Sequence, residues 1–219
     1  MPRKLSFRAA SARRVRIAEE AARILMEEGI TDYGSAKRKA ALRLGEKGHG
    51  QHLPSNQEIE SVLSVRQRLY APGELEARVH QMRETAWRVM SLLQPLEIRL
   101  AGGALSSVGP SAMEVDLHVF ADSPEAVAFR LLEVGLDYRL AERRLRFKGG
   151  EEVFPVYRLE QENPPIHLTV FEADDIRQAP LSPVDGRPMR RIGRRELGQL
   201  IGRSAPEETF SGPQDFPER

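Results

Sequence analysis

Two carboxylates separated by one apolar residue stand in the segment EVDLHVF, residues 114–120. Polar and apolar residues alternate strictly along it, and this period of two predicts a β-strand with Glu114 and Asp116 on one face. Two such carboxylates can reach one divalent ion, and Mg²⁺ prefers hard oxygen ligands beside nucleotide phosphates. The pattern predicts that Glu114 and Asp116 are metal ligands and catalytic residues, suited to moving a nucleotidyl group onto a hydroxyl by in-line displacement.

A pair of glycines, Gly102 and Gly103, ends the strand expected over residues 97–101, ten residues before Glu114. Glycines let a triphosphate approach the backbone, and the N–H groups of the turn can bind its oxygens. Ser106 and Ser107 follow, either as further phosphate contacts or as part of a plain loop. We expect nucleotide or polyphosphate binding at this turn.

The order of these features resembles the nucleotidyltransferase superfamily, the polymerase-β-like fold, over roughly residues 97–172. In that family a Gly-Gly or Gly-Ser turn precedes an Asp-apolar-Asp pair in a strand at about this spacing. The resemblance implies a mixed sheet with flanking helices, a nucleotide substrate and Mg²⁺ as the cofactor of an active member.

Two departures from the family pattern bear on activity. Glu114 stands where the family usually has Asp, and active members take a third carboxylate from a later strand. The corresponding strand here, IHLTVF at 166–171, offers His167 and Thr169 instead, with Glu172 and Asp174 just beyond its end. His167 could act as the base in place of the missing acid. We expect a nucleotidyltransferase-like protein with degenerate or absent transferase activity, and a Mg²⁺-dependent transferase is the alternative.

The whole chain also resembles a group of uncharacterised proteobacterial proteins, in the stretches EEGITDYGSAKRKAA, LPSNQEIE, HVFAD and APLSPVDGRPMRR. The name muramate–alanine ligase has been given to some of them. An ATP-dependent ligase of that type needs a Gly-Lys-Ser/Thr phosphate loop, and the sequence contains no such tripeptide.

An arginine-rich segment, APLSPVDGRPMRRIGRR at 179–195, combines a tight turn with five guanidinium groups. Arginine grips phosphate, so Arg187, Arg190 and Arg191 are candidate ligands for a nucleotide or for RNA. The alternative is a loop held by ion pairs to the C-terminal part of the chain. Residues 96–219 hold sixteen basic and twenty-one acidic residues, which makes such pairing plausible on charge.

The N-terminal end is basic, with twelve Lys or Arg against six Asp or Glu in residues 1–50. This imbalance indicates contact with RNA or another polyanion, or else a solvated, partly disordered arm. A second function follows from it: a catalytically silent adaptor that binds RNA or a protein partner through the basic helices, with Lys37-Arg38-Lys39 at their centre, and through the 187–195 loop.

Composition excludes several classes of protein. The 219 residues include no cysteine, which excludes disulfides, thiolate zinc sites and cysteine nucleophiles. The apolar runs are far shorter than a membrane span, and no apolar stretch follows the basic N-terminus as in a secretory signal. We expect a bacterial cytoplasmic protein without a membrane partner.

The elements that must position these residues follow from periodicity. Helices are expected over about 12–28, 32–44, 55–70, 74–93, 123–132 and 194–201, and strands over 97–101, 114–120, 137–147, 152–159 and 166–171. The apolar stripe from Leu75 to Leu93 has the clearest helical period and should be buried. The fold class is α+β: a disordered basic arm (1–10), a helical module (11–94), a nucleotidyltransferase-like mixed-sheet domain with flanking helices (95–202) and a disordered tail (203–219).

Overall fold

The structure is a computed structural model that describes residues 2–28, 30, 32–46, 53–70, 72–106 and 114–203. Over these residues the chain forms seven α-helices, one 3₁₀ helix and a six-stranded mixed sheet, with the first four helices preceding the first strand. The expected α+β class is therefore confirmed. The tail after Arg203, residue 1 and the 107–113 segment lie outside the described residues.

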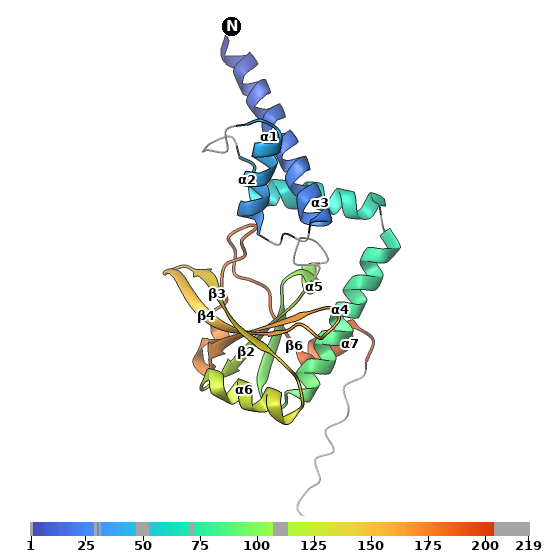
Figure 1. Ribbon diagram of the computed structural model, residues 1–219, viewed down its shortest axis with the longest axis vertical. Helices are drawn as coiled ribbons and strands as arrows, with labels where there is room; N and C mark the ends of the chain where they lie inside the picture. Colours follow the sequence, from blue (N-terminus) through green and yellow to red (C-terminus); the bar gives the residue numbers. More distant parts are fainter. Residues whose placement is uncertain are drawn as a thin grey trace, which may run out of the picture.

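The first three helices share a small hydrophobic cluster. They are α1 (Pro2–Glu27), α2 (Tyr33–Arg43) and α3 (Asn56–Tyr70). Alanines dominate the contact, so the helices approach closely, and Ile17, Ile24 and Leu63 fill the remaining space. In Figure 1, α1 projects away from the rest of the molecule. It begins at Pro2, ten residues before the start expected from periodicity, so the segment 2–10 is helical.

Two helix starts follow the local signals in the sequence. The Asp32 side chain accepts a hydrogen bond from the Ser35 N–H at 2.6 Å and caps α2. Ser55 and Glu58 form the reciprocal capping box of α3, with bonds of 2.6 and 3.1 Å.

The sheet has the strand order β3-β4-β5-β2-β1-β6. Its centre holds β1 (Glu97–Ala101) antiparallel to β2 (Val115–Ala121), and β2 parallel to β5 (Ile166–Glu172). A hairpin of β3 (Arg139–Phe147) and β4 (Gly150–Leu159) forms one edge, and the short β6 (Ile192–Gly193) forms the other. The expectation that residues 97–101 and 114–120 are adjacent strands of one mixed sheet is confirmed.

One face of the sheet carries the main hydrophobic core. Val115, Leu117 and Val119 of β2 point to this face, where α4 (Pro72–Leu92), α6 (Pro124–Glu133) and α7 (Arg194–Leu200) cover it, as Figure 1 shows. The apolar stripe expected over Leu75–Leu93 is only partly buried at Leu75 but buried from Val79 onward, and its members Met82, Ala86, Val89, Met90 and Leu93 join this core. The core thus joins α4 to the sheet rather than to α1–α3.

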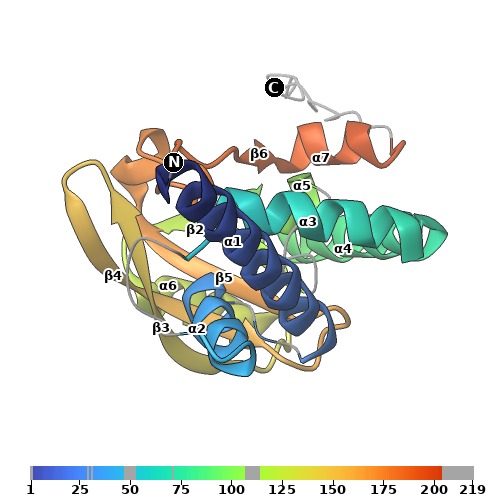
Figure 2. The ribbon, with the colours of Figure 1, turned by 90° about the horizontal axis from the view of Figure 1, so that it is seen from above.

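The other face of β2 carries Asp116, His118 and Phe120. Phe120 packs with Phe154 and Phe171 in a third cluster, next to the 3₁₀ helix η2 (Ala173–Arg177). Viewed from above in Figure 2, α1, α2 and α3 lie over the sheet half of the molecule. The strand ends that carry the candidate site residues therefore face the helical cluster.

Candidate functional site

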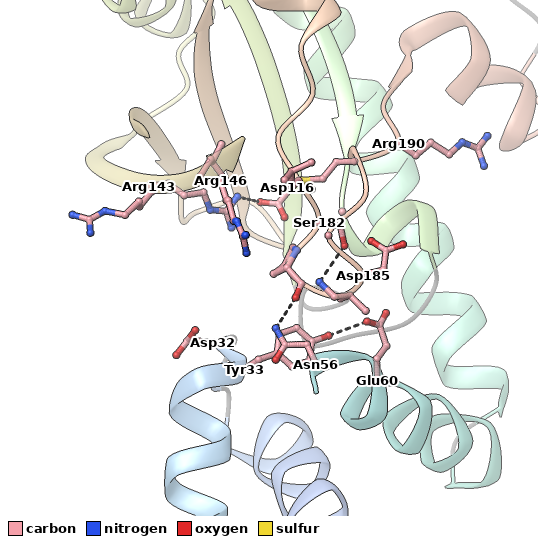
Figure 3. Close-up of a pocket in the computed structure, with 18 of the residues that line it drawn as sticks. Asp32, Tyr33, Asn56, Glu60, Asp116, Arg143, Arg146, Ser182, Asp185 and Arg190 are labelled. Carbon is pink, nitrogen blue, oxygen red and sulfur yellow. Dashed lines mark hydrogen bonds and ion pairs between the residues drawn. The ribbon is translucent and has the colours of Figure 1, made fainter. Parts of the chain in front are cut away.

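A cleft of about 1100 Å³ lies where the helical cluster faces the sheet. Its walls come from the ends of β1 and β2, from the β3–β4 hairpin, from α2 and α3, and from the loop 181–190. Figure 3 shows Asp116, Arg143 and Arg146 on one side of it and Tyr33 and Glu60 on the other. Four of the residues that the sequence singled out line this cleft, which both halves of the chain build: Gly102, Glu114, Asp116 and Arg190.

Asp116 lies in this cleft, but its carboxylate already has a cationic partner. Its Oδ1 atom is 2.6 Å from Nη1 of Arg143, and the Asp116 side chain is only 7% exposed. The attraction of Asp116 raises the pKa of Arg143, against the effect of burial. An ion pair this short and this enclosed largely neutralises the carboxylate.

Gly102 packs directly against that carboxylate. Its φ is +70°, a conformation that residues with a side chain rarely adopt, and a Cβ built on it would lie 2.8 Å from Oδ2 of Asp116. Gly103 is buried and begins the short helix α5 (Gly103–Ser106). The turn therefore has a packing role beside Asp116 as well as the phosphate role expected for it. Ser106 ends α5, and Ser107 lies outside the described residues.

Glu114 and His167 form a second pair beside the first. Asp116 faces His167 in the parallel register of β2 and β5. Glu114, just before β2, places Oε2 at 3.3 Å from Nδ1 of His167. Burial lowers the pKa of His167, which favours a neutral imidazole at neutral pH. Glu114, Asp116 and His167 therefore lie close together, as the sequence predicts.

The later acids do not complete a carboxylate triad. Glu172 pairs with Ala121 in the register of β2 and β5, five residues from the Asp116–His167 pair, which corresponds to about 16 Å along the strands. Asp174 lies in the 3₁₀ helix that follows. Both acids are at the opposite end of β5 from the cleft.

A Mg²⁺ ion does not fit the two acids as they are arranged. The metal needs free carboxylate oxygens, but Asp116 is paired with Arg143 and Glu114 with His167. Within the described part of the chain, no group of three or more histidine or acidic side chains is placed to hold a metal.

His118 is a cleft residue that sequence reasoning left out. It is 1% exposed and its ring lies 4.7 Å from that of Phe171. Burial lowers its pKa to about 3, so the ring is neutral, and its Nδ1 has no hydrogen-bond partner among the described residues. The alternation of EVDLHVF does place His118 on the face of Asp116, and this was the available signal.

The three arginines predicted to bind phosphate do not converge. Arg190 lines the cleft and also pairs with Glu196 at 3.1 Å. Arg187 is exposed, 4.0 Å from Asp185 in its own turn. Arg191 donates to the Ile176 carbonyl at 2.7 Å and lies over the Phe120 ring, outside the cleft. Their contacts are largely those of the alternative reading, a loop held by local partners.

A different set of arginines lines the cleft on the side of β3, whereas the Arg190 guanidinium points away from them in Figure 3. Arg143, Arg144 and Arg146 come from β3, in the segment RLAERRLRF. Arg144 is 4.0 Å from Glu151, whereas no carboxylate in the described ranges pairs with Arg146. Sequence reasoning missed these residues, although three arginines within four positions were a visible signal.

Two of the four basic residues of α2 are engaged with acids of α1 or of the residue that follows it. Arg43 lies 2.6 Å from Glu28 and 3.3 Å from Glu20, and Lys39 pairs with Glu28. Burial lowers the pKa of Lys37. Part of the charge expected to meet RNA thus joins the helices to each other.

Two further findings concern the chain as a whole. None of the helices in the described ranges combines the length and the apolarity needed to cross a membrane. Comparison with protein-family models, with curated proteins and with solved structures gives no match.

Proposed function

We propose that this protein binds a nucleotide or a related polyphosphate in the cleft between its helices and its sheet, and that its nucleotidyltransferase-like half serves binding rather than transfer. The observation that carries the proposal is the ion pair of Asp116 and Arg143 inside a cleft lined by further arginines. The arginines of the cleft supply cationic groups for phosphate. The ion pair with Arg143 occupies Asp116, the acid that nucleotidyl transfer would need as a metal ligand.

The cationic side of the cleft supports a phosphate ligand. Guanidinium groups bind phosphate through paired hydrogen bonds. Arg143, Arg144 and Arg146 line the cleft from neighbouring positions of one strand, so the cationic groups of this wall come from β3. Arg146 has the strongest case, because it is exposed at the cleft and forms no ion pair within the described residues.

The helical wall of the cleft, which carries Glu60, supports a ligand that has a nucleoside as well as phosphates. Tyr33 donates to Glu60 at 3.2 Å, and Asn56 lies beside them at the helical wall. Carboxylates and amides accept hydrogen bonds from amino and hydroxyl groups, which nucleosides carry. A nucleotide with its phosphates toward β3 and its nucleoside toward α2 and α3 would match the charge of both walls.

Titration calorimetry with ATP, GTP, CTP and UTP tests the proposal, with each nucleotide measured in Mg²⁺ and in excess chelator. At least one nucleotide should bind in chelator. Arg146→Ala should weaken that binding about tenfold, as expected for the loss of one charged phosphate contact. Arg139→Ala is the matched control, because Arg139 lies on the same strand but is 78% exposed and pairs with Glu160.

Two results would contradict the proposal. One is the absence of binding by all four nucleotides. The other is nucleotide turnover that requires Mg²⁺ and disappears in Asp116→Asn, which would show that the acid acts as a metal ligand after all.

A further inference from the structure

The Arg143 side chain sits where the family pattern would have a metal ion. Its Nη1 atom is 2.6 Å from Oδ1 of Asp116, and Glu114 also acts on its charge. Its side chain is two-thirds enclosed, which suits a guanidinium because this group is more weakly hydrated than an ammonium. Asp116 is held from the other side by the Gly102 turn, so the carboxylate cannot easily turn away.

We infer that Arg143 is a built-in cation that replaces a divalent metal between Glu114 and Asp116, so that the site binds its anionic ligand without metal. This inference rests on the proposed function, because it specifies how the same cleft is neutralised. On this inference, Arg143 is the residue that keeps a divalent metal out of the site.

A guanidinium suits this role for chemical reasons. Arginine stays protonated at any ordinary pH, and its planar group offers five N–H donors, so it can hold a carboxylate and still donate to a ligand. It brings one positive charge where Mg²⁺ would bring two. The remaining neutralisation of a polyphosphate can come from Arg144 and Arg146, the other arginines of β3 that line the cleft.

Arg143 reaches Asp116 from a strand that is not a neighbour of β2 in the sheet. In the sheet order, β3 is three strands away from β2, which is about 14 Å in a flat sheet and farther than an arginine side chain reaches. The β3–β4 hairpin must therefore curve toward the face that carries Asp116, as strongly twisted edge hairpins do. The curvature of the hairpin is therefore what brings Arg143 to Asp116.

Mn²⁺ binding by variants of the full chain tests the inference, with free Mn²⁺ followed by electron paramagnetic resonance. Wild type should leave millimolar Mn²⁺ free. Arg143→Met removes the charge at similar length, and it should bind one Mn²⁺ at least tenfold more tightly than wild type does. The double variant Arg143→Met/Asp116→Asn should lose that site. Arg139→Met, the matched change on the same strand, should behave as wild type.

Folding is monitored by circular dichroism in each sample, because Arg143→Met leaves an acid uncompensated. A variant that unfolds alone but folds in millimolar Mn²⁺ supports the inference. A folded Arg143→Met without a Mn²⁺ site overturns it, and so does an Arg143→Met that stays unfolded in Mn²⁺. Wild type that binds Mn²⁺ through Asp116 overturns it too. These outcomes do not involve nucleotide, so they are separate from success or failure of the calorimetry above.

Discussion

Gly102 offers a direct test of how tightly the Asp116 carboxylate is held. Gly102→Ala must adopt a left-handed backbone and place its Cβ 2.8 Å from Oδ2 of Asp116, whose other oxygen is fixed by Arg143. Gly135→Ala has the same φ of +70° but no atom within 4 Å of the new Cβ. Gly135→Ala should cost about 1 kcal/mol in backbone strain. Gly102→Ala should cost at least about 1 kcal/mol more because of the added overlap.

Urea denaturation of the two glycine variants measures this difference in the free energy of unfolding. Because backbone strain is common to both, the excess isolates the contact with Asp116. Equal losses would mean that the carboxylate moves aside freely, which would also weaken the case for a fixed Arg143 cation.

His118 should make stability depend on pH. In the unfolded chain its pKa is near 6.5, whereas burial lowers it to about 3 in the folded protein, with Asp116 opposing and Arg191 and Arg143 assisting. Between these values the unfolded state binds more protons, so stability falls as pH falls. At pH 5 the loss relative to stability well above pH 6.5 should be about 2 kcal/mol for this one group.

His118→Phe should flatten that slope, because a phenyl ring keeps the contact with Phe171 but binds no proton. Urea unfolding at pH 5, 6 and 7 gives the measurement, and His80→Gln, at an exposed site on α4, is the control that should keep the wild-type slope. An unchanged slope in His118→Phe would show that His118 titrates normally. His167 contributes in the same direction, so some slope should remain.

Sequence patterning predicted the near neighbours within the site but not the distant one. The period of two in EVDLHVF correctly placed Glu114 and Asp116 toward one side, and His167 was correctly chosen as the residue facing them. Arg143 was not predicted, because its contact with Asp116 joins strands 27 residues apart whose relative curvature no local pattern encodes. The lack of a hydrogen-bond partner for Nδ1 of His118 could not be predicted either, because it depends on which side chains pack against that face of the sheet.

At the scale of elements, prediction succeeded where a local signal decides the outcome. Capping residues correctly marked the starts of α2 and α3, and the apolar stripe of α4 correctly marked a buried helix. Periodicity missed the N-terminal ten residues of α1, since a helix without an apolar stripe leaves no periodic signal. The choice between ion pairs and ligand contacts for the 187–195 arginines could not be made from sequence, because the acids nearby are only known once the loop is placed.

At the scale of the molecule, the described residues form two larger cores of unequal size beside the small phenylalanine cluster of Phe120, Phe154 and Phe171. The core of the sheet contains 21 buried residues, whereas the cluster of α1–α3 contains eleven, five of them alanine. A cluster this small is marginal on its own, because short segments bury too little apolar surface to offset their conformational entropy. The helical part should therefore depend on its attachment to the sheet half.

The loop 181–190 provides that attachment. Val184 packs into the helical cluster, and the amide of Asn56 on α3 donates to the carbonyl of Pro183 at 2.6 Å. The same loop lines the cleft. Ligand affinity and the docking of the helices should consequently depend on the same few contacts.

Val184→Asp should uncouple the two cores. A carboxylate at this position would have to enter an apolar contact beside the acids Glu60 and Asp185, which costs about 1–3 kcal/mol even before their repulsion is counted. Calorimetry should then show α1–α3 unfolding in a separate transition below that of the sheet, whose temperature should stay near the wild-type value. Val153→Asp is the matched control, because Val153 is 52% exposed on β4 and makes no part of either core. A single transition in Val184→Asp at the wild-type temperature would mean that α1–α3 hold together without the loop, and the cleft would then have two independently stable walls.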